Sequence, residues 1–261
     1  RRLHDSRPDV VAGPPVPVLA VARHAAALGP SRVRAALLSS DRAGPALRNA
    51  LVALWHCEVH DHYGMTEMGL GGGVGRAAHA GYHMREAELL LEVVDPASGA
   101  PLPDGCFGEL VLTTLLRRGL PLIRYRTGDL SRVMPGPCTC GSALMRLDRI
   151  QGRIGASLRV GAGQLTQEDL DEALLGLPQV IDFAARHSPG HSPGHPPSLR
   201  IDVATLPGHA DTRALSEAVA RLPVLASALA RQQLHLELTV LADGRLRSLG
   251  GKRRIAVDNG A

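Results

Sequence analysis

Over the first sixty residues of the chain, apolar and polar positions show two different spacings, one typical of helices and one typical of strands. Two stretches, 18–27 and 45–55, carry apolar side chains at helical spacing, and one face of the second holds Leu47, Leu51 and Leu54. Three shorter apolar or alternating runs predict strands at 9–12, 33–39 and 58–60. Strands and helices that follow one another in this way indicate an α/β layer.

The next part of the chain has the composition of a β-rich unit. Three apolar runs predict strands at 88–94, 109–114 and 120–125. Asp95-Pro96 and Asp104-Gly105 lie between the first two runs and are typical turn residues. We therefore expect a hairpin or meander here.

After Gly152-Arg153 the pattern becomes that of a small α+β unit. Thr166 followed by Asp169 is typical of a helix N-terminus, and an apolar stripe continues through Leu170, Ala173, Leu174 and Leu177. The other predicted elements are a strand at 199–203, one or two helices over 214–229 broken at Pro223, and an alternating strand at 234–241. These changes predict a domain boundary near Arg153, with domains over 1–152 and 153–261.

The polar segment 187–197 repeats the sequence His-Ser-Pro-Gly. Its three histidines at four-residue spacing could be taken for a metal-binding tract. Proline and glycine disfavour a helix, however, so we expect a solvated loop.

The amino-acid composition argues against several classes of protein. A hydrophobic content of 44% is sufficient for a core, and the net charge of +4 comes from arginines that are scattered along the chain. With only 2% aromatic residues, the chain lacks the stacking platforms of a nucleic-acid reader. No apolar run reaches about 18 residues, so no membrane span is expected. Four cysteines, two of them in a Cys-x-Cys pair, fit a reducing cytoplasm better than a disulfide framework.

Three short segments carry side chains suited to nucleotide chemistry. Segment 62–67, His-Tyr-Gly-Met-Thr-Glu, can stack a base, contact a phosphate and hold magnesium. Segment 121–129 ends in Asp129, whose carboxylate suits ribose hydroxyls. Segment 250–252 places the Lys252 ammonium beside two glycines, where it could neutralise charge on a phosphoryl or acyl oxygen. Together they predict an enzyme that uses ATP for adenylation.

Through these segments the chain resembles the adenylate-forming superfamily of acyl-CoA synthetases, and within it the phenylacetate-CoA ligase branch. The matching stretches are 63–67, 108–115, 120–130, 138–141, 152–153 and the terminal Gly251-Lys252. The resemblance implies an α/β fold: residues 1–152 would be the C-terminal part of the large AMP-binding domain, an α/β layer plus a β-rich subdomain. Residues 153–261 would be the small mobile α+β lid domain.

No segment fits the Ser/Thr/Gly-rich phosphate loop that members of the family carry upstream. We therefore expect the C-terminal portion of a longer ligase, or a truncated relative, with much of the acyl pocket elsewhere. The implied reaction joins a carboxylic acid, with an aromatic acid favoured, to CoA through an acyl-adenylate, using ATP and magnesium. A non-catalytic nucleotide-binding or partner-interaction remnant is the alternative, and a carrier-protein thiol is another acceptor. The oligomeric state stays open, with a homodimer among the options.

The resemblance assigns roles within the first motif. Tyr63 would lie against adenine, with Gly64 and Met65 in the same nucleotide-binding turn, while Thr66 contacts phosphate and Glu67 holds magnesium. Glycines between 69 and 73 would let the backbone approach a ligand closely. The alternative is a surface turn whose glutamate caps a helix.

Asp129 and Arg153 would hold the rest of the nucleotide. Asp129 would bind the ribose hydroxyls, and Arg153 would reach the ribose or α-phosphate from the junction of the domains. The alternative is a set of structural ion pairs, Asp129 with Arg126 or Arg132 and Arg153 with a nearby acid.

Lys252 resembles the catalytic lysine that stabilises the pentavalent α-phosphate and the attacking carboxylate. It is the only lysine of the chain, although a solubilising basic tail, Lys252-Arg253-Arg254, is the alternative. The family usually carries a charged hinge residue where this chain has Gly155, which still permits rotation.

Cys138 and Cys140 suggest a structural zinc site. In this branch such a pair can join a histidine, matched here by His83, and a further cysteine, whose position is occupied by Arg76. His79 could substitute as the fourth ligand. The alternative is a pair of ordinary reduced thiols in a loop.

Overall fold

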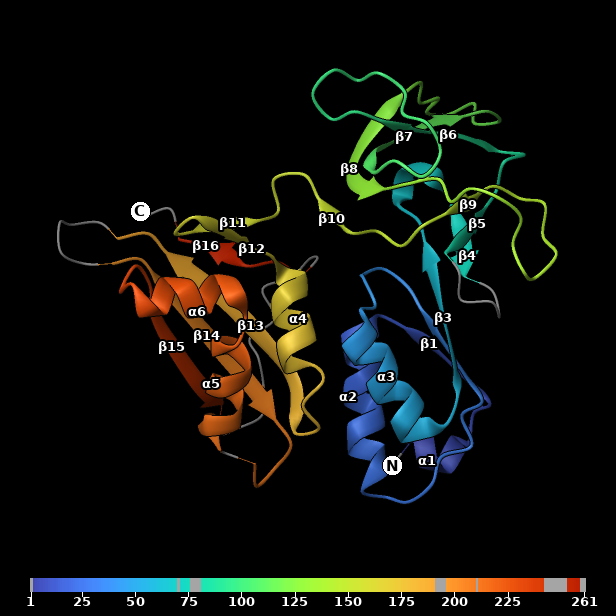
Figure 1. Cartoon of the computed structure of the whole chain (residues 1–261). Helices are drawn as coiled ribbons and strands as arrows, with labels where there is room; N and C mark the ends of the chain where they lie inside the picture. Colours follow the sequence, from blue (N-terminus) through green and yellow to red (C-terminus); the bar gives the residue numbers. More distant parts are fainter. Residues whose placement is uncertain are drawn as a thin grey trace. The chain divides into compact units, whose positions relative to one another are not determined.

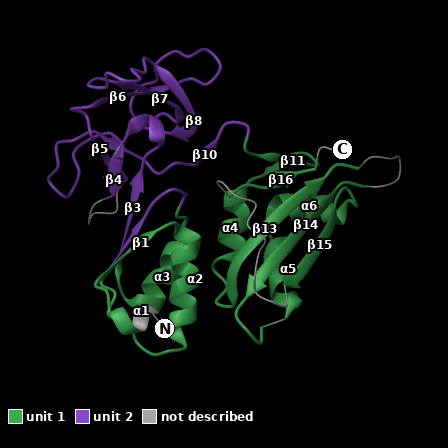
Figure 2. Ribbon diagram, turned by 180° about the vertical axis from the view of Figure 1, so that it is seen from behind, with its two compact units in different colours: residues 1–34, 43–58, 156–261 green, residues 35–42, 59–155 purple. Residues whose placement is uncertain are grey.

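The computed structural model describes residues 2–69, 71–75, 81–190, 196–209, 211–241 and 253–258. The chain separates into two compact units, shown in different colours in Figure 2. Unit 1 comprises residues 1–34, 43–58 and 156–261, and unit 2 comprises 35–42 and 59–155. The break after residue 155 lies close to Arg153, whereas 1–34 and 43–58 group with the C-terminal residues. The division into domains 1–152 and 153–261 stays a prediction.

The N-terminal part of unit 1 contains two long helices, α2 (Pro15–Ala26) and α3 (Pro45–Trp55), besides α1 (Arg2–Ser6) and strand β1 (Val10–Gly13). Each long helix begins with proline in its first turn, where the missing amide proton costs no hydrogen bond. The predicted helix at 45–55 is confirmed, and the one predicted at 18–27 begins three residues earlier, at Pro15.

Two contacts join these helices to the rest of unit 1. The guanidinium of Arg23 on α2 is buried and donates to the carbonyl oxygen of Leu175. The amide of Ala46, in the first turn of α3, donates to a carboxylate oxygen of Glu172 at 2.9 Å. A carboxylate at a helix N-terminus also interacts favourably with the helix dipole. These two hydrogen bonds connect α2 and α3 to the C-terminal part of unit 1.

The C-terminal part of unit 1 is built on a four-stranded sheet in the order β15-β14-β13-β16 (Figure 1). Its strands are β13 (Val180–Ser188), β14 (Ser198–Thr205), β15 (His235–Leu241) and β16 (Ala256–Val257). The pair β13–β14 is antiparallel, and both outer pairs are parallel. A ribbon of β11 (Leu158–Val160) and β12 (Gly163–Leu165) precedes the sheet. The strands predicted at 199–203 and 234–241 are confirmed.

Helices α4 (Gln167–Leu174), α5 (Thr212–Ala220) and α6 (Pro223–Ala230) complete this part. The Thr166 hydroxyl accepts from the Asp169 amide, and the Asp169 carboxylate accepts from the Thr166 amide, which confirms the predicted cap as a capping box. Pro223 opens α6, so the stretch 214–229 is two helices as the proline predicted. None of the helices among the described residues is long and apolar enough to cross a membrane.

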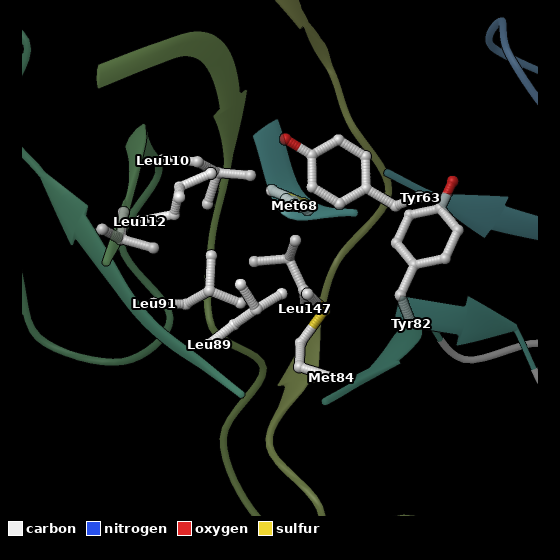
Figure 3. Packing of buried hydrophobic residues seen from close by; sticks show 10 residues of the cluster. Tyr63, Met68, Tyr82, Met84, Leu89, Leu91, Leu110, Leu112 and Leu147 are labelled. Carbon is white, nitrogen blue, oxygen red and sulfur yellow. The ribbon is translucent and has the colours of Figure 1, made fainter. Parts of the chain in front are cut away.

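Unit 2 contains two sheets whose apolar faces share one core (Figure 3). The first runs β2 (Ala35–Leu38), β3 (Glu58–Tyr63), β4 (Gly73–Gly75), β5 (Tyr82–Met84) and β9 (Arg146–Leu147). The second runs β10 (Gly152–Arg153), β8 (Tyr125–Ser131), β7 (Gly108–Thr114) and β6 (Leu89–Val94). Strands β6 and β7 confirm the predicted hairpin. Tyr63, in the first motif, and Met68, which directly follows it, belong to the same buried cluster as Leu110 and Leu112.

The strand predicted at 120–125 is wrong, because regular pairing begins only at Tyr125. The amides of Leu122 and Arg124 donate to the hydroxyls of Thr114 and Thr113 rather than to backbone carbonyls. Arg124 has a φ of 49°, outside the range of a strand, and Ile123 is 81% exposed. The apolar run is thus a surface bend, and the polar motif that follows it forms the strand β8.

The predicted loop at 187–197 is shorter than expected. His187 and Ser188 are the last residues of β13, and His187 is buried. Pro189, Gly190 and 196–197 have no regular structure, and 191–195 lie outside the described residues. The period-two pattern of β13 therefore extends into the repeat.

Truncation of Leu112 should destabilise unit 2, because its side chain is completely buried in the shared core. We expect Leu112→Ala to lower the free energy of unfolding by about 2–5 kcal/mol. Leu116, which is 70% exposed, provides the matched control. Leu116→Ala should change the free energy of unfolding by no more than about 0.5 kcal/mol. Urea denaturation measures both; equal effects would contradict the assignment of the core.

Candidate functional site

Two motifs that are far apart in the sequence meet at the junction of β3 and β8. The Tyr63 hydroxyl donates to Oδ2 of Asp129 at 2.9 Å, and the two residues are 7% and 8% exposed. Alternation along β3 turns Val59, Asp61 and Tyr63 toward the interior, since these three are buried and their neighbours are less so. The ring of Tyr63 also packs against the ring of Tyr82, with 5.9 Å between the two ring centroids.

The third predicted residue, Arg153, joins this pair. Strand β10 pairs with β8 so that Arg153 lies opposite Asp129, and Nε of Arg153 is 3.5 Å from Oδ1 of Asp129. Nη2 of Arg153 also donates to the carbonyl oxygen of Thr127 at 2.8 Å. Tyr63, Asp129 and Arg153, which we call the Tyr–Asp–Arg cluster, are therefore in direct contact.

The expected alternative partners of Asp129 bind other acids. Arg126 pairs with Glu109, and Nε of Arg132 is 2.8 Å from Oδ2 of Asp148. Neither Arg126 nor Arg132 is therefore the partner of Asp129. The acid that pairs with Arg153 is Asp129 itself, so the two predicted nucleotide contacts are one ion pair.

The backbone around Asp129 is fixed by side chains of its own sheet. The Thr127 hydroxyl donates to Leu110 O at 2.9 Å and accepts from the Asp129 amide at 3.0 Å. Gly128 has a φ of 77°, which favours glycine, and its amide donates to Glu109 at 3.0 Å. The register of β7 against β8 shifts between Glu109 and Val111. This irregularity sets the direction of the Asp129 side chain.

Glu67 and Thr66 lie on the short helix η1 (Thr66–Met68) that follows β3. Met65 is the N-cap residue of this helix, with no side-chain hydrogen bond, and is partly buried against the shared core. Glu67 is half-buried and accepts a hydrogen bond from the Tyr125 hydroxyl at 3.3 Å, while Thr66 is exposed. The alternative of a glutamate that caps a helix is therefore not what the structure shows.

The glycines around the motif permit a close backbone approach. The amide of Gly72 donates to Tyr63 O at 2.8 Å, and a Cβ on Gly64 would lie 3.1 Å from the Cα of Gly71. A Cβ on Gly71 would lie 2.8 Å from Nε2 of His62. Leu70 lies outside the described residues. A side chain at Gly64 or Gly71 would therefore crowd its neighbours, so small residues are needed in this tight turn.

Sequence reasoning missed several polar partners of these residues. Tyr125 contacts Glu67, Thr127 orients Asp129, and Nδ1 of His62 is 2.9 Å from the Ser39 hydroxyl. Tyr125 and Thr127 stand in the same segment, 121–129, as Asp129, so the motif itself carried the signal. Ser39 gave none, because its partner is 23 residues away along the chain.

The predicted catalytic lysine, Lys252, lies with Gly250 and Gly251 outside the described residues. The hinge position Gly155 is described and has a φ of 75°, a conformation that a charged side chain would adopt only with strain.

A second group of residues has the composition of a metal site. One ligand atom from each of His83, Cys138 and Cys140 lies within 4.8 Å of the other two. Sγ of Cys140 is 3.4 Å from Nε2 of His83, and the backbone amide of Cys140 is the main cause that lowers the pKa of the Cys138 thiol. Thiolate and imidazole are ligands that zinc prefers. Arg76 and His79 lie outside the described residues.

Burial dominates the electrostatics of Tyr63. Loss of solvent contact raises the pKa of its phenol far above the ordinary value, and the Asp129 charge and hydrogen bond raise it further. Tyr63 is therefore a permanent hydrogen-bond donor to Asp129 at physiological pH.

No family model matches the chain. A phenylacetate-coenzyme A ligase of Thermus thermophilus is 38% identical over 122 residues, 46% of this chain and 27% of that protein. The enzyme of the same name from Aromatoleum evansii is 29% identical over 185 residues, 68% of this chain and 41% of that protein. The chain thus spans less than half the length of these curated relatives.

Solved structures share the fold at lower identity. A 2-hydroxyisobutyryl-CoA ligase, solved with an acyl-AMP, aligns with a TM-score of 0.78 at 22% identity, over 99% of this chain and 56% of its own. A benzoate CoA ligase from Burkholderia xenovorans aligns with a TM-score of 0.61 at 19% identity, over 97% and 51%. The chain is therefore similar in fold to adenylate-forming CoA ligases. Over part of its length it is similar in sequence to phenylacetate-CoA ligases.

The raised pKa of Tyr63 predicts a loss of stability in alkali. Its unfolded-state pKa is near 10.0 and its folded-state pKa lies above that, so the stabilisation is complete below pH 10 and is lost as the pH rises further. Above pH 10 the free energy of unfolding should fall less steeply with pH in Tyr63→Phe than in the unsubstituted protein, by up to about 1.4 kcal/mol per pH unit. Urea denaturation at neutral pH and at about pH 11 measures the difference; an equal fall in both proteins would refute a buried neutral phenol.

Proposed function

We propose that the chain is the nucleotide-binding and C-terminal portion of an AMP-forming carboxylate-CoA ligase. The observation that carries this proposal is the Tyr–Asp–Arg cluster, which joins three of the family's motifs in one place. The relatives' names support an acid-thiol ligase, and the free cysteines suit the cytoplasm, where ATP and CoA are available.

Asp129 would bind the ribose of ATP. An ionised carboxylate has about four acceptor sites, and Tyr63 and Arg153 use only part of this capacity. The remaining sites would accept both ribose hydroxyls, while Arg153 would add positive charge toward the ribose or α-phosphate. Because Tyr63 stays protonated, it keeps the carboxylate in one orientation. The turn at Tyr63, Gly64 and Met65 would lie along the adenine.

Thr66 and Glu67 would contact the phosphates. Thr66 is exposed and Glu67 half-buried, so both are accessible to a ligand, and the Tyr125 hydroxyl restrains the Glu67 carboxylate. Magnesium held by Glu67 would neutralise phosphate charge. The hydrogen bond from Tyr125 would reduce the entropy lost when the carboxylate is ordered around the ion.

The proposed chemistry has two steps. In the first, a carboxylate oxygen of the acid attacks the α-phosphorus of ATP, and pyrophosphate leaves; Lys252 would neutralise the charge on the phosphoryl oxygens. In the second, the CoA thiolate attacks the acyl carbonyl carbon, and AMP leaves. The sequence relatives named for phenylacetate support an aromatic acid as the substrate. A carrier-protein thiol would replace CoA in the second step without changing the first.

We also propose that His83, Cys138 and Cys140 hold a structural zinc ion. Two of the three residues, His83 and Cys138, are buried, and all three ligand atoms converge. The ion would tie the loop at 138–140 to strand β5. Because the ligands are thiolates and an imidazole and two of the three residues are buried, the proposed role is stability rather than catalysis.

Zinc binding should depend on Cys140 and not on the other exposed cysteine, Cys106. We expect Cys140→Ser to release the metal, because a site reduced to two ligands binds weakly, and Cys106→Ser to keep it. Metal content after dialysis, measured by elemental analysis, reports the difference. If the unsubstituted protein binds no zinc, the two cysteines are ordinary thiols.

Acid-dependent exchange of pyrophosphate into ATP, without CoA, tests the ligase proposal on the full reading frame. We expect exchange with one class of acid from a panel of aryl and aliphatic acids. Lys252→Ala should abolish it and Asp129→Asn should reduce it by about 10- to 100-fold, the worth of hydrogen bonds to a charged group.

Absence of exchange with every acid, in a protein that still binds ATP, would favour the non-catalytic nucleotide-binding remnant. Exchange that survives in Lys252→Ala would remove the lysine from the mechanism while leaving the ligase intact.

A further inference from the structure

A second buried carboxylate, Asp61, lies two residues before Tyr63 on β3 and has partners of the same kinds as Asp129. Its Oδ2 accepts from the Tyr82 hydroxyl at 3.0 Å and pairs with Nη1 of Arg149 at 3.1 Å. Asp61 is 6% exposed, so these partners offset the cost of taking its charge out of water. We call Asp61, Tyr82 and Arg149 the Asp61 cluster.

The first connection between the Asp61 cluster and the Tyr–Asp–Arg cluster runs through the two tyrosines. Asp61 and Tyr63 are both buried on alternate positions of β3, so their side chains point to the same face. The ring of Tyr82, whose hydroxyl binds Asp61, packs against the ring of Tyr63 (Figure 3). The Tyr63 hydroxyl in turn donates to Asp129. Displacement of Tyr82 would therefore change the packing that holds the Tyr63 hydroxyl at this carboxylate.

The second connection runs along the chain from Arg149 to Arg153. Arg149 pairs with Asp61 of the first sheet, and Arg153 pairs with Asp129 of the second sheet. The two arginines are four positions apart, and the amide of Gln151 between them donates to a backbone carbonyl of β8 at 2.9 Å. A segment this short spans at most about 3.6 Å per residue, so a shift at one end is transmitted to the other.

Both partners of Asp129 are thus attached, by separate routes, to the same carboxylate. We propose that Asp61 is a positioning residue: through the Asp61 cluster it holds the two partners of Asp129 in place, so that Asp129 presents its remaining acceptor sites to the ribose. Recognition by a few hydrogen bonds requires such support, because the recognising group must be held within about 0.5 Å of its productive position. This inference rests on the proposed function, in which Asp129 binds the ribose.

Calorimetry on the full reading frame tests this role through the preference for AMP over 2′,3′-dideoxy-AMP. Asp61→Asn keeps the shape of the side chain and removes its charge, so the ion pair with Arg149 is lost. We expect the preference for AMP to fall by about five- to tenfold, the worth of one hydrogen bond at the ribose. General damage to the fold would weaken the binding of both nucleotides alike. An unchanged ratio of the two affinities would therefore overturn the proposal.

Two further variants give a result even if Asp61→Asn folds poorly. Tyr82→Phe keeps the ring and the pair of Asp61 with Arg149 and removes the hydroxyl, so it should lower the preference for AMP by about three- to fivefold. Glu92→Gln is the matched control, because it breaks an ion pair of the same unit, with Arg124 at 3.2 Å, that belongs to neither cluster. It should leave the preference within about twofold. Equal preferences in Tyr82→Phe and Glu92→Gln would contradict the positioning role.

Asp129→Asn separates failure of this inference from failure of the proposed function. In that background Asp61→Asn should lower the preference no further, because the carboxylate that Asp61 positions is already gone. If the unsubstituted protein shows no preference for AMP, the proposed role of Asp129 is wrong, and urea denaturation then decides whether Asp61 positions it. Positioning predicts that the double variant loses less stability than the two single variants combined, and additive losses would refute it.

Discussion

The hydrogen bond from Tyr63 to Asp129 holds together parts of unit 2 that come from different sheets. Tyr63 ends β3 and contributes its ring to the shared core, whereas Asp129 lies on β8 and pairs with Arg153 on β10. The carboxylate is buried, so it needs these partners to offset the cost of leaving water. The same partners fix its direction, and a fixed carboxylate at the edge of an apolar core is what recognition of a ribose requires.

Much of the fold was predictable because local signals and tertiary packing agree. The helix at 45–55 carries its apolar stripe and an opening proline, and the capping box at Thr166 needs only residues three apart. Pro223 is tolerated in the first turn of a helix but not in its interior. The hairpin of β6 and β7 has both the apolar runs and the turn residues. Tyr63, Asp129 and Arg153 could be chosen as candidate site residues because each stands in a segment that resembles a family motif, and the structure shows Asp129 in contact with both of the others.

The rest depended on contacts between distant residues, which no local pattern encodes. The run 120–125 has the composition of a strand, but the hydroxyls of Thr113 and Thr114 accept hydrogen bonds from its amides, and Leu120 and Ile123 stay exposed. The Arg153 partner could have been any acid, and only the pairing of β10 with β8 selects Asp129. Asp61 and Arg149 are 88 residues apart along the chain, so their ion pair becomes visible only in three dimensions.

Recognition of the ribose by Asp129 is the central claim, and a comparison of two nucleotides tests it most directly. Calorimetry would measure the affinities of AMP and of 2′,3′-dideoxy-AMP for the unsubstituted protein and for Asp129→Asn. Hydrogen bonds to a charged group predict that the unsubstituted protein prefers AMP by about 10- to 100-fold and that Asp129→Asn loses most of this preference. An equal preference in both proteins would contradict the assignment of Asp129 to the ribose.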